Sequence, residues 1–129
     1  MFFLLLQYTS TPMSTYAGDR FAANRDAIVE SVLNTPGALS HAVRAAIYDR
    51  AAGRGGEFAN VPALLAAFVD KAIRNAYKVV DEDVERLLQA GYAEDAVYEA
   101  IITVAAGAGM RRIEAGMAAM NTNADQEKK

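Results

Sequence analysis

Along most of the chain, apolar residues recur every three or four positions, which is the spacing of one face of an α-helix. Breaks in this pattern fall at Thr35 and Pro36, at the glycine-rich stretch 53–56 and at Gly91. Between these breaks the pattern predicts five helices, over residues 18–33, 36–52, 62–77, 81–90 and 94–120. We therefore expect an all-α fold, a single-domain helical bundle of about five helices with a long C-terminal helix.

Caps and core positions follow from the same pattern. Thr35 followed by Pro36 suits the N-cap and first turn of the second helix, and Asp81 suits the N-cap of the fourth. Arg44 lies on the polar face of the second helix, so we expect it either to be solvated or to bind a carboxylate. The positions expected in the core are Leu39, Val43, Ile47 and Ala51, then Leu64, Leu65, Phe68, Val69, Ile73 and Tyr77, then Val84, Leu87, Leu88, Tyr92 and Tyr98.

The middle of the long helix contains glycines at 107 and 109, which lower helix propensity without a local reason. Small residues let another helix approach closely, so Gly107 and Gly109 predict either a tight helix crossing or a subunit interface. Further along, apolar residues at spacings of three, four and three predict a seam for a partner helix, although core packing within one chain explains them equally well. These seam residues are Met110, Ile113, Met117 and Met120.

The two ends of the chain differ in character from the middle. Residues 1–6 are apolar, but the run is too short for a secretory signal or a membrane span. We expect residues 1–17 to be an N-terminal extension, either flexible or the product of a misassigned start, with translation beginning at Met13 instead of Met1. The alternative is an apolar tail that docks on a neighbouring surface. Residues 121–129 are polar and are expected to be a disordered tail.

Composition removes whole classes of chemistry. The chain has 129 residues, no cysteine and one histidine, which excludes disulfides, thiolate metal sites, iron–sulfur clusters and thiol-based redox mechanisms. The acidic run 81–83 has no calcium-loop spacing, so we expect neither a metal nor a cofactor. The net charge of −3 favours neither nucleic acid nor a membrane surface as a partner, and we expect a cytoplasmic protein.

Four side chains are candidates for chemistry. His41 is the only histidine, the residue type that most often acts as general acid or base near neutral pH, although a purely structural role is the alternative. Arg44, one turn along, is placed to bind a carboxylate beside it. Arg111 and Arg112 are expected to form ion pairs across a subunit boundary, and the alternative is that they bind the carboxylate of a small ligand.

Two consecutive segments resemble a known protein family. They are residues 80–100, VDEDVERLLQAGYAEDAVYEA, and residues 101–117, IITVAAGAGMRRIEAGM. They are similar to the carboxy-terminal part of the carboxymuconolactone decarboxylase and alkylhydroperoxidase D-like superfamily, over about residues 60–118. The resemblance implies an all-helical fold that forms homo-oligomers. The peroxidase branch of that family uses a Cys-x-x-Cys motif with nearby Glu and His, and this chain has no such motif. No catalytic residue of the decarboxylase branch matches a position here one by one.

We therefore expect a non-redox member of that family, a helical homo-oligomer that binds a small molecule, such as a small carboxylate, or a partner, without peroxidase activity. The alternative is a cysteine-independent acid–base enzyme, such as a carboxymuconolactone-type decarboxylase, that uses His41 with an arginine on a carboxylate substrate. A third possibility is a purely structural assembly unit. The enzyme requires His41 or a glutamate in a closed pocket near Arg111 or Arg112, whereas a binding protein allows these groups to lie apart.

Overall fold

The structure, a computed structural model, describes residues 13–55 and 58–127, with side chains over 20–55 and 58–121. Within these residues the chain is all-α and contains no strand, as the periodicity predicted. The expectations for residues 1–12, including the choice between Met1 and Met13, lie outside this part of the chain. The helices are α2 (Met13–Asn34), α3 (His41–Ala51), α4 (Ala63–Arg74), the short 3-10 helix η1 (Ala76–Lys78), α5 (Asp81–Gln89) and α6 (Glu94–Glu127).

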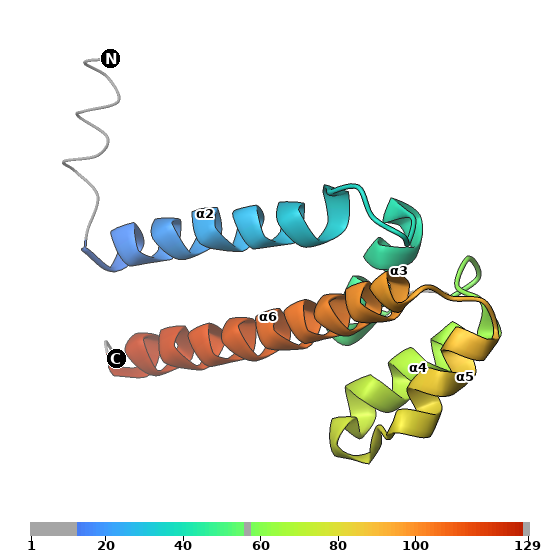
Figure 1. Ribbon diagram of the computed structural model, residues 1–129. Coiled ribbons are helices and arrows are strands. Elements are labelled where there is room, and N and C mark those ends of the chain that lie inside the picture. Colours follow the sequence, from blue (N-terminus) through green and yellow to red (C-terminus); the bar gives the residue numbers. More distant parts are fainter. Residues whose placement is uncertain (1–12, 56–57, 128–129) are drawn as a thin grey trace.

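The long helix α6 is the centre of the arrangement (Figure 1). It contacts each of the other four α-helices, and its contact with α3 is the most extensive. In the view of Figure 1, α2 lies along one side of α6, and the α4–α5 pair lies on the other side near the start of α6. Among the described residues, one face of α6 is therefore left without a helix over it.

Of the fifteen predicted core positions, seven are buried and five more are partly buried. Leu39, just before α3, and Ile47 and Ala51 of α3 lie in the main apolar cluster, together with residues of α4, α5 and α6. Val43 packs against the edge of this cluster. A second, smaller cluster lies under α2 and consists of Tyr48, Ala52 and Met110. Burial raises the pKa of Tyr48, so its phenol is neutral at physiological pH.

An ion pair joins α3 to α4. The Arg50 guanidinium donates two hydrogen bonds to the Asp70 carboxylate, at 2.9 and 3.1 Å. The same guanidinium lies 4.3 Å from the centre of the Phe58 ring, close enough for a cation–π interaction. These contacts hold α4 against α3 at the edge of the core.

Two predicted helix starts are wrong. The second predicted helix begins at His41, not at Pro36, and its N-cap is Ser40, whose hydroxyl accepts a hydrogen bond from the Val43 N–H. Thr35 instead donates its hydroxyl hydrogen to the Ser31 carbonyl at the end of α2. For α5 the N-cap is Val80, not Asp81, because the Asp83 carboxylate accepts the Val80 N–H and supplies the capping contact.

Leu64 of α4 and two tyrosines, all expected in the core, lie outside it, and Leu64 is 39 % exposed. Helix α4 ends at Arg74, so Tyr77 falls in η1 and is 81 % exposed. Tyr98 is 65 % exposed on α6. Tyr92, in contrast, packs against the main cluster. A tyrosine at helical spacing therefore did not by itself indicate burial here.

The two long helices extend past their predicted ends. Helix α2 begins at Met13, five residues before the predicted start, and α6 continues to Glu127, where a disordered tail was expected after residue 120. Residues 121–127 contain neither glycine nor proline. Extending an existing helix by one residue requires far less free energy than starting one, so a polar sequence suffices to continue it.

Gly107 lies where α6 crosses α3. A Cβ atom at this position would lie 2.6 Å from the Tyr48 carbonyl oxygen and 2.8 Å from the Ala51 Cβ atom. Of the two possibilities stated for Gly107, the tight helix crossing is the one seen, and it lies within a single chain. Gly109 and Gly116 have nothing within 4 Å of such a Cβ atom, so α3 does not require glycine at either position.

We predict that Gly107→Ala lowers the free energy of unfolding by about 1–3 kcal/mol, because the added methyl group forces the α3 backbone away from α6. The matched control is Gly116→Ala on the same helix, which should raise stability by about 0.5–1 kcal/mol because alanine is the better helix former. Urea unfolding followed by circular dichroism measures both. Equal effects of the two substitutions would contradict the close crossing.

Candidate functional site

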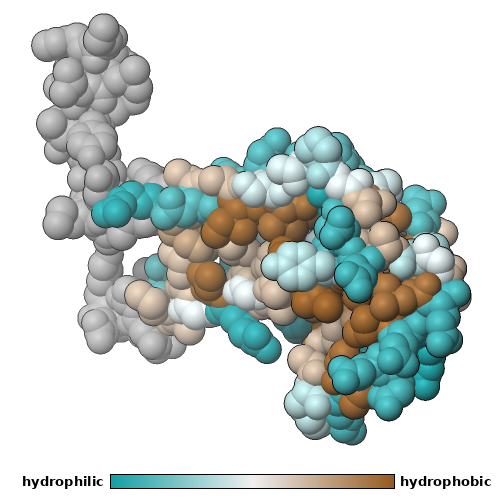
Figure 2. Space-filling view, viewed as in Figure 1, coloured by the Kyte–Doolittle hydropathy of each residue, from teal (hydrophilic) through white to brown (hydrophobic). Residues whose placement is uncertain are grey.

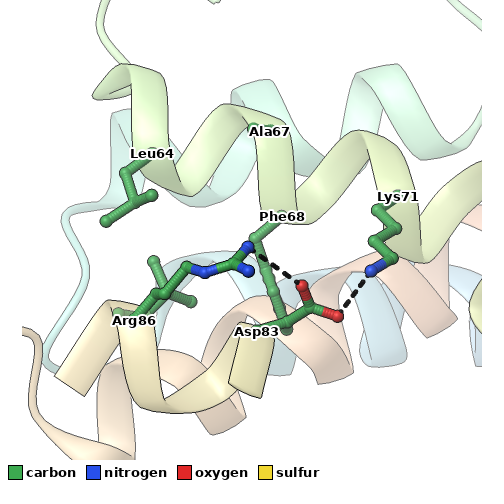
Figure 3. A pocket seen from close by; sticks show the side chains of 7 residues that line it. Leu64, Ala67, Phe68, Lys71, Asp83 and Arg86 are labelled. Atoms are coloured by element: carbon green, nitrogen blue, oxygen red, sulfur yellow. Dashed lines mark hydrogen bonds and ion pairs between the residues drawn. The ribbon is translucent and has the colours of Figure 1, made fainter. Parts of the chain in front are cut away.

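The first pocket lies between α4 and α5 and has a volume of about 180 Å³. Its charged lining residues are Lys71, Asp83 and Arg86, and Figure 3 shows both cations pointing at the carboxylate. Lys71 donates a hydrogen bond to Asp83 at 2.7 Å, and Arg86 lies 3.6 Å from its other oxygen. The carboxylate also caps α5, so this cluster is satisfied internally and has a structural role.

The second pocket, of about 210 Å³, lies between the end of α2 and α6. Arg44 and Glu99 both line it, and each is used to hold the connection between α2 and α3. The Glu99 carboxylate accepts the backbone N–H groups of Ala38 and Leu39, both at 2.8 Å. It also lies so close to Gly37 that a Cβ atom there would collide with it.

Arg44 is buried, with 2 % of its surface exposed, so the expectation of a solvated side chain is wrong. Its guanidinium donates hydrogen bonds to the Val32 carbonyl at 3.0 Å and to the Thr35 carbonyl at 2.5 Å. Carbonyls in the last turn of a helix have no partner within the helix, and the negative end of the helix dipole attracts a cation. Arg44 therefore closes the C-terminal end of α2 and is not available to bind a ligand carboxylate through those nitrogens.

Two further pockets, of about 220 and 320 Å³, lie side by side along α6 next to α4 and share Ile73, Ala108 and Arg112. Arg111 lines the smaller of the two. Within the described residues neither Arg111 nor Arg112 has a carboxylate within 4 Å. Glu114, three residues after Arg111, lies 3.6 Å from Arg54. Arg111 lies against the backbone of Gly53, at the end of α3.

His41 lies far from these arginines. It is exposed, it is the first residue of α3, and it lines none of the four pockets described above. Arg111 lies at the other end of α3, and eleven residues of helix span about 16 Å. The structure therefore does not bring the candidate base and the candidate anion-binding arginines together.

The side of α6 that no other helix covers is apolar along about six turns. We call it the outward face, and it includes five large apolar side chains that are 38–70 % exposed, several small residues and one charged residue, Arg112. Figure 2 shows apolar surface extending over this region between α2 and the α4–α5 pair. The residues of the outward face are Tyr98, Ile101, Ile102, Ala105, Gly109, Arg112, Ile113, Gly116 and Met120.

The predicted seam overlaps this face only in part. Met110 is buried within the chain against Tyr48 and Ala52, and Met117 is half-buried. Ile113 and Met120 are exposed and belong to the outward face. Tyr98 was assigned to the core, and Ile101 and Ile102 were assigned to no site. The reason is that a single apolar stripe was assumed on α6, whereas the helix is apolar on two opposite sides. The helical period places all three residues on the second side.

Comparisons with protein-family models, with curated proteins and with solved structures found no match for this chain. Among the described residues, no helix is both long and apolar enough to cross a bilayer. The same residues contain no group of three or more side chains suited to hold a metal ion. The candidate site therefore depends on the geometry alone, and the outward face of α6 is its largest unexplained feature.

We predict that Arg44→Met lowers the free energy of unfolding by about 2 kcal/mol, because two helix-terminal carbonyls lose a charged donor. The exposed Arg74 on α4 is the matched control, and Arg74→Met should change stability by less than about 0.5 kcal/mol. Urea unfolding at neutral pH measures the difference. If Arg44→Met is as stable as the native chain, the guanidinium does not hold the end of α2.

The hydrogen bond from Lys71, followed by that from Val80, lowers the pKa of Asp83 from its usual value. A carboxyl group with a lowered pKa in the folded state contributes stability above its unfolded pKa and loses it as pH falls through its folded pKa. We therefore predict that Asp83→Asn reduces the loss of stability between about pH 5 and pH 2.5. Urea unfolding across this range measures the slope, and Asp81→Asn, the same change at an exposed position of the same turn, should leave it as in the native chain.

Proposed function

We propose that the protein is a non-catalytic helical binding protein whose binding surface is the outward face of α6. The observation that carries this proposal is an exposed helix face on which Tyr98, Ile101, Ile102, Ile113 and Met120 accompany a single charge. Contiguous exposed apolar surface of this kind marks sites for protein partners or apolar ligands in proteins that are not aggregating.

The walls of the face support the same proposal. The end of α2 borders it on one side, with the pocket that includes Tyr98 and Ile102, and α4 borders it on the other, with the pocket that includes Ile101 and Ala105. A partner helix lying on α6 would therefore find depressions on both sides for its own side chains. The proposal includes membership in the carboxymuconolactone decarboxylase and alkylhydroperoxidase D-like group, supported by the short capped α5, the turn at Gly91 and the long α6.

The acid–base enzyme has less support. It requires His41 or a glutamate in a closed pocket with Arg111 or Arg112, and the geometry separates His41 from them by the length of α3. A small carboxylate ligand is compatible with the binding proposal, because Arg112 supplies a cation at the apolar pockets beside α4. Such a ligand would occupy the edge of the same surface.

The test uses anilinonaphthalene sulfonate, an apolar anionic dye that fluoresces on apolar protein surface, in excess over dilute protein. We predict that Ile101→Lys weakens dye binding about tenfold or more, because it places a charge among the bulky apolar side chains of the outward face. Leu64→Lys on α4 is the matched control, since Leu64 is 39 % exposed and Ile101 is 42 % exposed. Fluorescence titration gives both affinities, and an unchanged affinity in Ile101→Lys would refute the assignment of the surface.

A further inference from the structure

Two opposite charges lie on the side of α6 that includes the outward face, Glu94 one turn before Tyr98 and Arg112 within the face. Glu94 and Arg112 are 18 residues apart, which is five turns at 3.6 residues per turn, so both project from the same side of the helix. Both are exposed, and among the described residues neither has an opposite charge within 4 Å. This side of α6 thus has an acid at its first turn and a base about 27 Å further along.

Between these charges the size of the side chains also changes along the helix. The first half has the bulky residues Tyr98, Ile101 and Ile102, and the second half has the small residues Ala105, Ala108 and Gly109. Among the described residues no contact requires glycine at 109, where a Cβ atom would meet nothing within 4 Å. Each half therefore has the size and the charge that the other half lacks.

We infer that the occupant of this face is the α6 helix of a second copy of the chain, packed antiparallel about a twofold axis near Thr103. This inference depends on the proposed function, because it names the partner of the same surface. In this register, Glu94 of each copy lies opposite Arg112 of the other, Tyr98 lies over Ala108 and Gly109, and Ile101 and Ile102 lie over Ala105. The pairing is self-complementary, as a twofold dimer requires.

A parallel arrangement would lose both kinds of complementarity. It would place Glu94 beside Glu94 and Tyr98 against Tyr98, so like charges and bulky rings would meet across the interface. The small residues would then face one another across a gap, which forfeits dispersion contacts. The charge and size pattern therefore selects one orientation and one register.

Charge reversal tests the register. We predict that the native chain shows a mass approaching twice 13.8 kDa as its concentration rises in sedimentation equilibrium. Glu94→Arg and Arg112→Glu should each weaken association about tenfold or more, because like charges then meet twice in the dimer. The double variant with both substitutions should recover the native association to within about threefold, since the two charges exchange places.

A pair of glycines gives a matched steric test. Gly109→Leu places a bulky side chain under Tyr98 of the other copy and should abolish the dimer, while circular dichroism shows an intact helix. Gly116→Leu makes the same change on the same face beyond the last paired turn and should leave the dimer intact. Both positions have open space within the chain, so neither substitution strains the fold.

Cysteine cross-linking reports the contact directly, because the native chain has no cysteine. In one chain, residues 98 and 109 are about 16 Å apart along the helix, too far for an internal disulfide. The variant with Tyr98→Cys and Gly109→Cys should therefore form covalent dimers on oxidation, and the variant with Tyr98→Cys and Gly116→Cys should not.

A native chain that stays at 13.8 kDa at every concentration overturns the inference, and so does a dimer that is indifferent to both charge reversals. If the chain stays monomeric and dye binding still depends on Ile101, only the self-pairing is overturned. If the chain stays monomeric and dye binding does not depend on Ile101, the proposed function is overturned as well. If the chain stays monomeric and removal of residues 1–12 increases dye binding, the occupant of the face is the chain's own amino-terminal segment. That result also overturns the inference.

Discussion

The close contact between α3 and α6 fixes the position of every other helix. At Gly107 the two backbones approach until no side chain fits between them, and Ile47 and Ala51 of α3 are fully buried beside Ala100 and Val104 of α6. Because α6 also contacts α2, α4 and α5, its placement on α3 sets where those helices lie. The same crossing turns the opposite side of α6 away from the core, so a single packing constraint creates both the core and the outward face.

Polar side chains then position the walls of that face. Two side chains hold the connection between α2 and α3. Arg44 of α3 donates hydrogen bonds to backbone carbonyls, and Glu99 of α6 accepts hydrogen bonds from backbone N–H groups. A buried arginine costs free energy unless its hydrogen bonds are made. Movement of the end of α2 would break the hydrogen bonds of Arg44, so these bonds keep that end in place. On the other side, the Arg50–Asp70 pair holds α4 to α3. The two walls are thus attached to α3, while α6 forms the floor between them.

Much of the fold could be predicted from the sequence, because the period of the apolar residues and the positions of glycine and proline depend on local geometry. The stripe at Leu39, Ile47 and Ala51 and the turn at Gly91 are examples. The partners of Arg44 and Glu99 could not be predicted, since they involve residues as far as 61 positions away. The start of α3 depends on that distant carboxylate as well as on Ser40, which is why the local Thr35 and Pro36 signal was misleading. The outward face was only partly identified, because Tyr98 was assigned to the core.

A helix that is apolar on all sides is normally buried on all sides. Between residues 96 and 110, α6 has Val97, Ala100 and Val104 on the side toward α3 and Ile101, Ile102 and Ala105 on the side away from it. The described residues of one chain cover only the first of these sides. Exposure of the second costs free energy in proportion to its apolar area, and glycine at 109 adds a cost in helix propensity that no contact within the chain offsets. In the dimer inferred above, the α6 helix of the second copy would cover this side and lie close to Gly109, so a single contact would offset both costs.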